Sequence, residues 1–408
     1  MYKEEPARAA APRLPAWTAG LIPLLVLGAL LLLFSAVNPL GMFSQDLPPI
    51  EALTIERIKV LDNGFEVSVL NSGPDPVTIA QVMVDDAYWQ FSAQPGQRLA
   101  RLARATVFIP YQWIYAEPHN IILVTDTGLT FAGEVAVAAP TPTPGLREFA
   151  GYGLLGVYVG VIPVAVGLMW YPAMRRMGRK WLEALLALTL GLLVFLLIDT
   201  FLEVLETGAA VPAAFQAVPL AVFAALLTWL AIAALSARRR AGAEPARGLY
   251  LAGLIALSIG LHNFGEGLAV GAALALGEVA LGTFLVVGFI LHNLTEGVGI
   301  AAPLVKDAGQ ETEEGRSGPP LAVFAGLALL AGFPAVLGAW IGGFAFSPLL
   351  GVIFLGIGLG AIWQVIVEVA ALLRRSASRE GGALSWTNLG GFLLGLAIMY
   401  LTALLVKF

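Results

Sequence analysis

The chain contains no cysteine among its 408 residues. Disulfides, thiolate metal sites and thiol nucleophiles are therefore excluded, because each of them needs a cysteine sulfur. The same absence leaves the redox compartment open, since a chain without thiols suits reducing and oxidising surroundings equally. Histidine is also scarce, with three residues in the whole chain, so their positions carry information.

Charged residues are scarce as well. They make up 12% of the chain, against about a quarter in an ordinary soluble domain. Hydrophobic residues reach 58% and the mean hydropathy is +0.82. These values, together with long apolar runs, predict a polytopic membrane protein whose partner is the lipid bilayer. No basic, aromatic-rich stretch indicates binding to nucleic acid.

The N-terminal region predicts a short tail and one membrane helix. We expect residues 1–15 to form a polar cytoplasmic tail and residues 16–38 to form an anchor transmembrane helix. A cleaved signal peptide is the alternative interpretation. The apolar run is long for the hydrophobic region of a signal peptide, and no clean A-x-A site follows it, so we favour the anchor.

Residues 50–138 have a different pattern. Short segments rich in Val, Ile and Thr alternate apolar and polar residues, and turn signals such as Asp62-Asn63-Gly64 separate them. The pattern predicts a small all-β sandwich, immunoglobulin-like and exterior, in which His119 is expected to be a surface loop histidine. Residues 139–148 are rich in proline and predict a stiff linker.

The remaining residues, 149–408, predict a helical membrane domain with eight spans. We place the spans near residues 150–171, 182–206, 213–235, 249–273, 278–301, 320–343, 348–372 and 387–406.

Basic residues then predict the orientation. The clusters in 174–180, 237–247 and 374–380 all fall on the same side of the predicted topology, together with the N-terminal tail and the acidic loop 305–320. Because basic loops stay in the cytoplasm, we expect these segments to be cytoplasmic and the β-domain and C-terminus to be exterior. The predicted location is the cell membrane, plasma or inner, with several passes.

Two stretches of the fourth and fifth spans repeat one motif. LHNFGEGLAVG begins at Leu261 and LHNLTEGVGIA begins at Leu291, and each contains His-Asn-x-x-Glu-Gly within an apolar run. His262 and Glu266 are separated by one helical turn, as are His292 and Glu296. An ionised glutamate at mid-span is costly unless it is paired or coordinated. One isolated pair would suit a local hydrogen bond, whereas two matched pairs on consecutive spans favour a metal site.

Imidazole nitrogen and carboxylate oxygen suit Zn²⁺ first, then Fe²⁺ and Mn²⁺. Antiparallel packing shifted by one turn would put His262 level with Glu296, and Glu266 level with His292. The four side chains would then form one cage. Asn263 and Asn293 can add carbonyl oxygens on the adjacent side as secondary, weaker ligands.

These motifs resemble the fourth and fifth transmembrane helices of the ZIP (Zrt/Irt-like) metal transporters, in their bacterial branch. The likeness extends over roughly residues 150–408, where GLGAIWQVIVE (358–368) is similar to the seventh helix of the family and GGFLLGLAIMY to its eighth. The resemblance implies transport of divalent metal through this site, commonly in a homodimer. It also implies that Glu266 and Glu296 bridge the main site and a second site at the asparagines.

The expected fold class is an all-α polytopic membrane protein. It has an eight-helix ZIP-like bundle, preceded by one anchor helix and a small all-β sandwich. We expect a transporter and not an enzyme, with no resident cofactor, because the transported Zn²⁺, Fe²⁺ or Mn²⁺ binds as substrate.

Three positions depart from the family pattern. Gly265 and Thr295 stand where the family often has proline, so a local helix distortion is less secure. Ala335 stands where the sixth helix of the family commonly offers a glutamate. A second site without that carboxylate would hold a dication weakly, so we expect one metal at a time.

Polar residues on two other spans indicate a transport pathway. Asp199 and Glu203 lie toward the outer end of the second span and form a candidate entry that concentrates cations. Glu206, next along this face, is expected to be a solvated helix end. Gln364 and Glu368 lie toward the cytoplasmic end of the seventh span and form a candidate exit relay.

Two other functional classes remain open from the sequence. An intramembrane metallo-hydrolase would need an open water position on its metal, but the chain has no H-E-x-x-H motif and the doubled motif fills the coordination shell. A membrane metal sensor would use the β-domain as its output module, because nothing else in the sequence assigns that domain a role.

Overall fold

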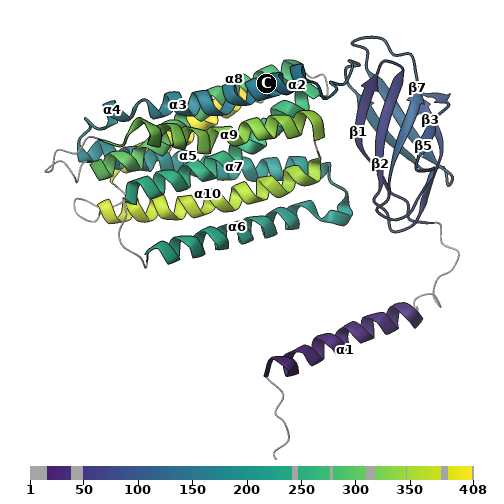
Figure 1. The fold of residues 1–408 in the computed structure, drawn as a ribbon, viewed down its shortest axis with the longest axis horizontal. Helices are drawn as coiled ribbons and strands as arrows, with labels where there is room; N and C mark the ends of the chain where they lie inside the picture. The colour runs from purple at the N-terminus through teal and green to yellow at the C-terminus, as the bar shows by residue number, and fades with distance from the viewer. Residues whose placement is uncertain are drawn as a thin grey trace, which may run out of the picture. The chain divides into compact units, whose positions relative to one another are not determined.

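The structure is a computed structural model (Figure 1). It describes residues 16–37, 49–240, 247–275, 279–308, 318–345, 347–377 and 385–406. The chain divides into two compact units, Met1–Ile50 and Glu51–Phe408. In the first unit, helix α1 (Ala16–Val37) runs for 22 residues without a charged side chain, which is the length that the predicted anchor requires. The predicted tail 1–15 lies outside the described residues.

The second unit begins with the predicted β-domain, whose strands form two antiparallel sheets. They are β1 (Leu53–Leu61), β2 (Gly64–Asn71), β3 (Val77–Val84), β4 (Ala87–Trp89), β5 (Ser92–Gln94), β6 (Arg98–Leu99), β7 (Arg104–Pro110), β8 (His119–Thr125) and β9 (Thr130–Val135). One sheet has the order β1-β2-β7-β5 and the other the order β4-β3-β8-β9, with β6 beside β3. This order corresponds to the two sheets of an immunoglobulin-type sandwich.

Alternation along the strands builds the core of the sandwich. Side chains such as Phe65 and Val107 from one sheet, and Ile79 and Leu123 from the other, are fully buried in one cluster. The predicted hairpin at Asp62-Asn63-Gly64 is confirmed, because β1 pairs with β2 and Leu61 lies opposite Gly64. Gly64 has φ +149°, and a methyl group there would overlap the carbonyl oxygen of Ile109, so only glycine fits.

The expectation that His119 is a surface loop histidine is wrong. His119 begins β8 and is 5% exposed, and its Nδ1 lies 2.7 Å from Asp85 Oδ2. Asp85 belongs to the turn between β3 and β4, where both Asp85 and Asp86 have positive φ. The same carboxylate accepts hydrogen bonds from the Asn120 amide and the Tyr111 hydroxyl. This network joins the strand start to the turn.

Eight helical segments among the described residues are long and apolar enough to cross a bilayer, so the protein is a multi-pass membrane protein. Both ends of each segment lie within four residues of the ends predicted for the corresponding span. The first segment comprises α2 (Leu146–Gly156), the π-helical turn η2 (Val157–Val161), α3 (Ile162–Leu168) and α4 (Tyr171–Met174). The others are α5 (Arg179–Ala209), α6 (Ala217–Arg240) with the preceding 3₁₀ turn η3 (Ala213–Phe215), α7 (Arg247–Ala275), α8 (Val279–Ala308), α9 (Leu321–Ala345), α10 (Pro348–Ala377) and α11 (Trp386–Val406).

Glycines bring the helix backbones into contact. A methyl group at Gly338 would overlap the carbonyl oxygen of Phe264, and one at Gly342 would overlap that of Leu268, so α9 packs directly on α7. The glycine pair 356/360 meets the α6 backbone in the same way, and the pair 391/395 meets α5. Such contacts suit a membrane interior, where small residues permit close packing of helices. Each of these three glycine pairs, with its members four residues apart, is therefore a packing face within one chain.

Of the segments that predict orientation, the structure describes all of 174–180, where Arg175, Arg176 and Arg179 are exposed. The other basic segments are described in part: Arg238–Arg240 end α6, Arg247 begins α7, and Arg374 and Arg375 lie in α10. Residues 241–246, 309–317 and 378–384 lie outside the described residues.

We expect Gly338→Ala to destabilise the bundle by about 1–3 kcal/mol, the range typical of overpacking. The added methyl group meets backbone, which cannot rotate away as a side chain can. Thermal unfolding of the full protein in detergent measures the effect. Gly326→Ala on the same helix is the control, because a methyl group there meets nothing within 4 Å. Equal midpoints for the two variants would contradict the packing role.

The Asp85 network predicts a loss of β-domain stability in acid. Burial alone would raise the pKa of Asp85, but the hydrogen bonds from His119, Asn120 and Tyr111 outweigh it and hold the pKa below its usual value. A depressed folded-state pKa stabilises the fold above the unfolded value of about 3.9, and this contribution disappears as the pH falls through the folded value.

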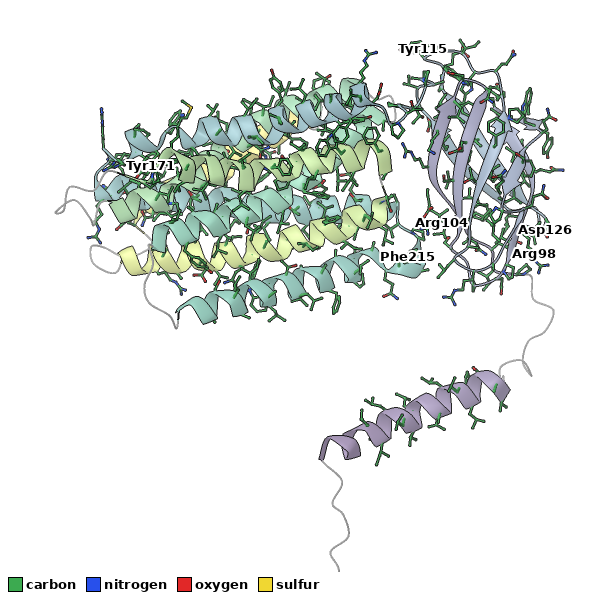
Figure 2. All side chains as sticks on the ribbon, in the orientation of Figure 1. Arg98, Arg104, Tyr115, Asp126, Tyr171 and Phe215 are labelled. Carbon is green, nitrogen blue, oxygen red and sulfur yellow. The ribbon has the colours of Figure 1, made fainter. Side chains whose placement is uncertain are left out.

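Asp85→Asn should therefore reduce hydrogen-exchange protection of β3 and β8 at pH 7. The difference from wild type should shrink as the pH falls below about 4 and vanish once the pH is below the folded-state pKa of Asp85. Asp85 is partly exposed, so we expect about 1 kcal/mol or less. Asp126→Asn, an exposed aspartate on the same domain (Figure 2), is the control. A difference that persists in acid would refute the assignment.

Candidate metal centre

The two repeated motifs lie on continuous helices. Every residue of α7 and α8 is α-helical through the motifs, so the structure shows no break at Gly265 or Thr295. A methyl group at Gly265 would lie 3.1 Å from Leu355 Cδ2, and the Thr295 hydroxyl donates to the His292 carbonyl oxygen over 2.7 Å. Both helices therefore present their His and Glu side chains with regular helical spacing.

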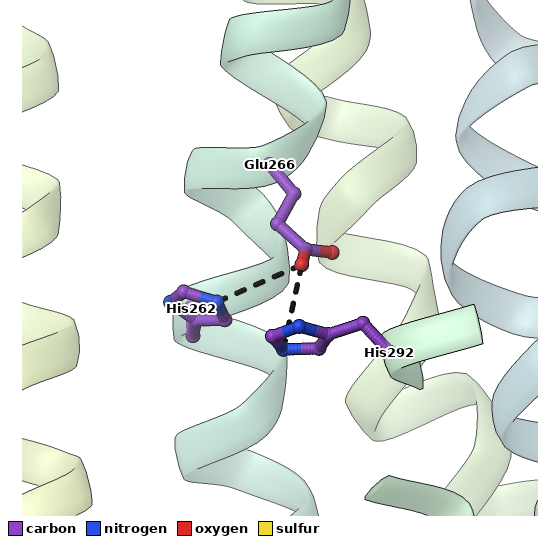
Figure 3. Close-up of side chains that lie close together, drawn as sticks. All are labelled: His262, Glu266 and His292. Carbon is purple, nitrogen blue, oxygen red and sulfur yellow. Dashed lines mark ion pairs between the residues drawn. The ribbon is translucent and has the colours of Figure 1, made fainter. Parts of the chain in front are cut away.

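Three of the predicted ligands converge at the middle of the bundle (Figure 3). Glu266 Oε1 lies 3.6 Å from His262 Nε2 on its own helix and 3.8 Å from His292 Nε2 on α8. One ligand atom from each of these residues lies within 4.8 Å of the others. Among the described residues, no other group of three His, Asp or Glu side chains meets this condition.

Glu296 is joined to this group through His292. Its Oε1 lies 3.2 Å from His292 Nε2, one helical turn away. The ring of His262 also lies beside that of His292, with the ring centroids 5.8 Å apart and the ring planes 18° from parallel. Glu266, as expected, is level with His292.

The four side chains are buried, yet several of their polar atoms have no hydrogen-bond partner. His262, Glu266, His292 and Glu296 are between 2% and 5% exposed. Glu266 Oε1, His292 Nε2 and both carboxylate oxygens of Glu296 accept or donate no hydrogen bond. An unsatisfied buried polar group costs about 1–3 kcal/mol, and more when it is charged. A cation bound between these atoms would satisfy them, and the nitrogen and oxygen set suits Zn²⁺, Fe²⁺ or Mn²⁺.

Asn263 and Asn293 are fully buried, and each side-chain amide donates a hydrogen bond to a backbone carbonyl oxygen of another helix. Asn263 Nδ2 donates to Ala331 O over 3.1 Å, and Asn293 Nδ2 donates to Val159 O over 2.9 Å. Asn293 Nδ2 also donates to Glu266 Oε2 over 2.7 Å, which leaves Oε1 directed at the two histidines. The Oδ1 atoms of both asparagines have no hydrogen-bond partner.

Ala335, where a glutamate would complete a second site, is fully buried on α9. Its carbonyl oxygen would overlap a methyl group placed at Gly267, so backbone contact occupies this side of α7. Gly297 meets the Val164 carbonyl of α3 in the same way. The glycine of each motif therefore fixes its helix against a different neighbour, and the ligand faces of α7 and α8 are left to meet each other.

The residues of the predicted entry lie on α5. Glu203 is half-buried and close enough to interact electrostatically with His262 and Glu266. Asp199 is also half-buried and interacts with Glu203, whereas Glu206 is exposed, as expected for a helix end.

The residues of the predicted exit form a separate pair. Gln364 is buried on α10, and its Nε2 donates to Glu368 Oε1 over 3.2 Å. The group of converging ligands does not include them.

One neighbour of the site was absent from the sequence prediction. Thr200 on α5 is fully buried, and its Oγ1 lies 3.0 Å from His262 Nδ1. The sequence feature that could have placed Thr200 near the site is its spacing, because Thr200 is three residues from Glu203 and lies on the same face of the helix. Threonine is unremarkable in an apolar span, so the signal is weak.

A small cavity borders Glu296. Its volume is about 10 Å³, roughly that needed for one water molecule. Apart from Glu296 its walls are mainly apolar: Leu192, Leu193, Leu196, Ile255, Ile259 and Met399, with Thr189 and Gly299. Apolar side chains thus close this side of the cluster.

Comparisons with known proteins assign the chain to no family. No protein-family model matches it, and no curated protein matches its sequence. The case for function therefore depends on the buried histidines and glutamates themselves.

Proposed function

We propose that the protein transports divalent transition-metal ions, zinc foremost, across the membrane. The observation that carries this proposal is the convergence of His262, Glu266 and His292 at mid-bundle, with Glu296 beside them and four of the polar atoms of this group without a hydrogen-bond partner. Polar residues so deep in a membrane protein mark ion pathways more often than structural pairs.

Charge balance supports a dication. Two ionised glutamates and two neutral imidazoles carry a net charge of −2, which one divalent ion neutralises. The absence of sulfur ligands favours Zn²⁺, Fe²⁺ and Mn²⁺ over Cu⁺, and imidazole disfavours Ca²⁺ and Mg²⁺.

The number of ligands favours transport over hydrolysis. A catalytic metal needs an open coordination position for water, whereas two His-Glu pairs supply four ligands.

The remaining polar residues suggest a direction. Glu203 and Asp199 lie on one side of the cluster and would attract a cation toward His262. The pair Gln364 and Glu368 would receive it toward the opposite end. With the basic loops in the cytoplasm, this path runs inward, so the proposal is uptake across the cell membrane with the β-domain exterior.

We also propose that residues 149–408 form a ZIP-like transport domain and act as a homodimer. The doubled motif and the eight spans support this assignment. The β-domain would then be an addition to the transport unit, in a docking, dimerising or gating role.

Uptake into proteoliposomes tests the proposal. Wild-type protein should accumulate Zn²⁺ in vesicles that contain a fluorescent zinc reporter. The double variant His262→Ala and Glu296→Ala should lose at least about 90% of this flux, because it removes one ligand from each helix. Glu183→Gln, a carboxylate at the start of α5 that pairs with Arg179, is the control and should retain flux. Unchanged uptake by the double variant would contradict the assignment of His262 and Glu296 as metal ligands.

Metal removal should lower stability by the binding free energy. We expect about one zinc per chain by mass spectrometry, because Ala335 supplies no carboxylate and Glu266 Oε2 already accepts a hydrogen bond from Asn293. Zinc at a hundred times its Kd should stabilise the protein by about 2.7 kcal/mol relative to the chelator-treated form. Glu266→Gln should abolish this difference. Two tightly bound ions per chain would contradict the single-site proposal.

A further inference from the structure

Thr200 contacts His262 from a different helix. Its hydroxyl oxygen lies 3.0 Å from His262 Nδ1 and 2.8 Å from the carbonyl oxygen of Leu196, one turn earlier on α5. Thr200 and Asn263 are fully buried and His262 is 3% exposed, so bulk water does not compete for these contacts. The inference below rests on the proposed metal site and concerns how one of its ligands is held.

The hydroxyl carries one proton and can accept further hydrogen bonds through its oxygen lone pairs. A carbonyl oxygen only accepts, so the bond to Leu196 O uses the hydroxyl proton, as is common for threonine in helices. The remaining contact then pairs a hydroxyl lone pair with His262 Nδ1. That pairing is a hydrogen bond only if Nδ1 carries the proton.

A neutral imidazole has one N–H and one bare nitrogen. With the proton on Nδ1, the lone pair of His262 is on Nε2. This is the nitrogen that faces Glu266 Oε1 at 3.6 Å, in the group of converging ligands. Glu266 Oε1 has no hydrogen-bond partner, as expected if Nε2 carries no proton to donate.

We propose that Thr200 is a positioning residue that fixes His262 in the tautomer whose Nε2 is free to bind metal. Hydrogen bonds to the second nitrogen of a ligating histidine set its tautomer and ring orientation. The same bond links α5, which carries Asp199 and Glu203, to the ligand face of α7.

Histidine NMR tests this on the full-length, metal-free protein in nanodiscs, at a pH where the rings are neutral. The chain has three histidines, so ¹⁵N-histidine labelling gives few signals, and a His262→Gln sample identifies the one that matters. We expect wild type to show His262 protonated on Nδ1. Thr200→Val, which removes the hydroxyl and keeps the branched shape, should give a mixture with the Nε2-protonated form. Thr200→Ser should restore the wild-type spectrum.

Zinc affinity is measured on the same three proteins by competition with a chelating dye. Thr200→Val should weaken binding about 10–100-fold, the range for loss of an outer-shell partner, and Thr200→Ser should stay near wild type. If Thr200→Val fails to fold, the wild-type tautomer and the serine variant still decide the question.

Two results would overturn the inference alone: His262 protonated on Nε2 in a wild-type protein that binds zinc, or a folded Thr200→Val with unchanged tautomer and affinity. Wild-type protein that binds no zinc while His262 is protonated on Nδ1 would overturn the proposed function, and with it the role of Thr200 in metal binding. The two failures are therefore distinguishable.

Discussion

The structure of the bundle depends on the cost of placing two carboxylates at the middle of apolar helices. Glu266 and Glu296 are almost wholly buried, and three of their four oxygens lack a hydrogen-bond partner. In a membrane interior such groups persist only if something compensates them. Here the compensation available from the chain is two imidazoles and one asparagine amide, which leaves a negative site suited to a cation.

Close backbone contact keeps this arrangement in place. Gly267 meets Ala335 on α9, and Gly297 meets Val164 on α3, so each motif helix is supported from behind. These contacts need no polar group, and they fix the rotation of α7 and α8 about their own axes. The direction in which each histidine and glutamate points is thus set by backbone contacts of glycine, alanine and valine residues, whose side chains have no polar atoms.

The sequence was enough to predict the membrane spans and the candidate metal ligands, because both follow from local patterns of residues. An apolar run of about 20 residues is readable directly, and so is a repeated His-Asn-x-x-Glu-Gly within it. What depended on distant partners was not predictable. His119 looks like a loop residue until the Asp85 turn, 34 residues away, buries it. The contact between His262 and Thr200 spans 62 residues and depends on how α5 packs against α7.

The burial of the four ligand side chains has a consequence for the proposed transport. His262, Glu266, His292 and Glu296 are at most 5% exposed. A cation bound between them would therefore exchange most of its bound water for protein atoms. Mg²⁺ gives up its water reluctantly and prefers oxygen ligands in an octahedron, whereas Zn²⁺ accepts four ligands readily. Under the proposed function, the burial of the ligands would therefore disfavour the abundant hard ions, before ligand chemistry distinguishes among the transition metals.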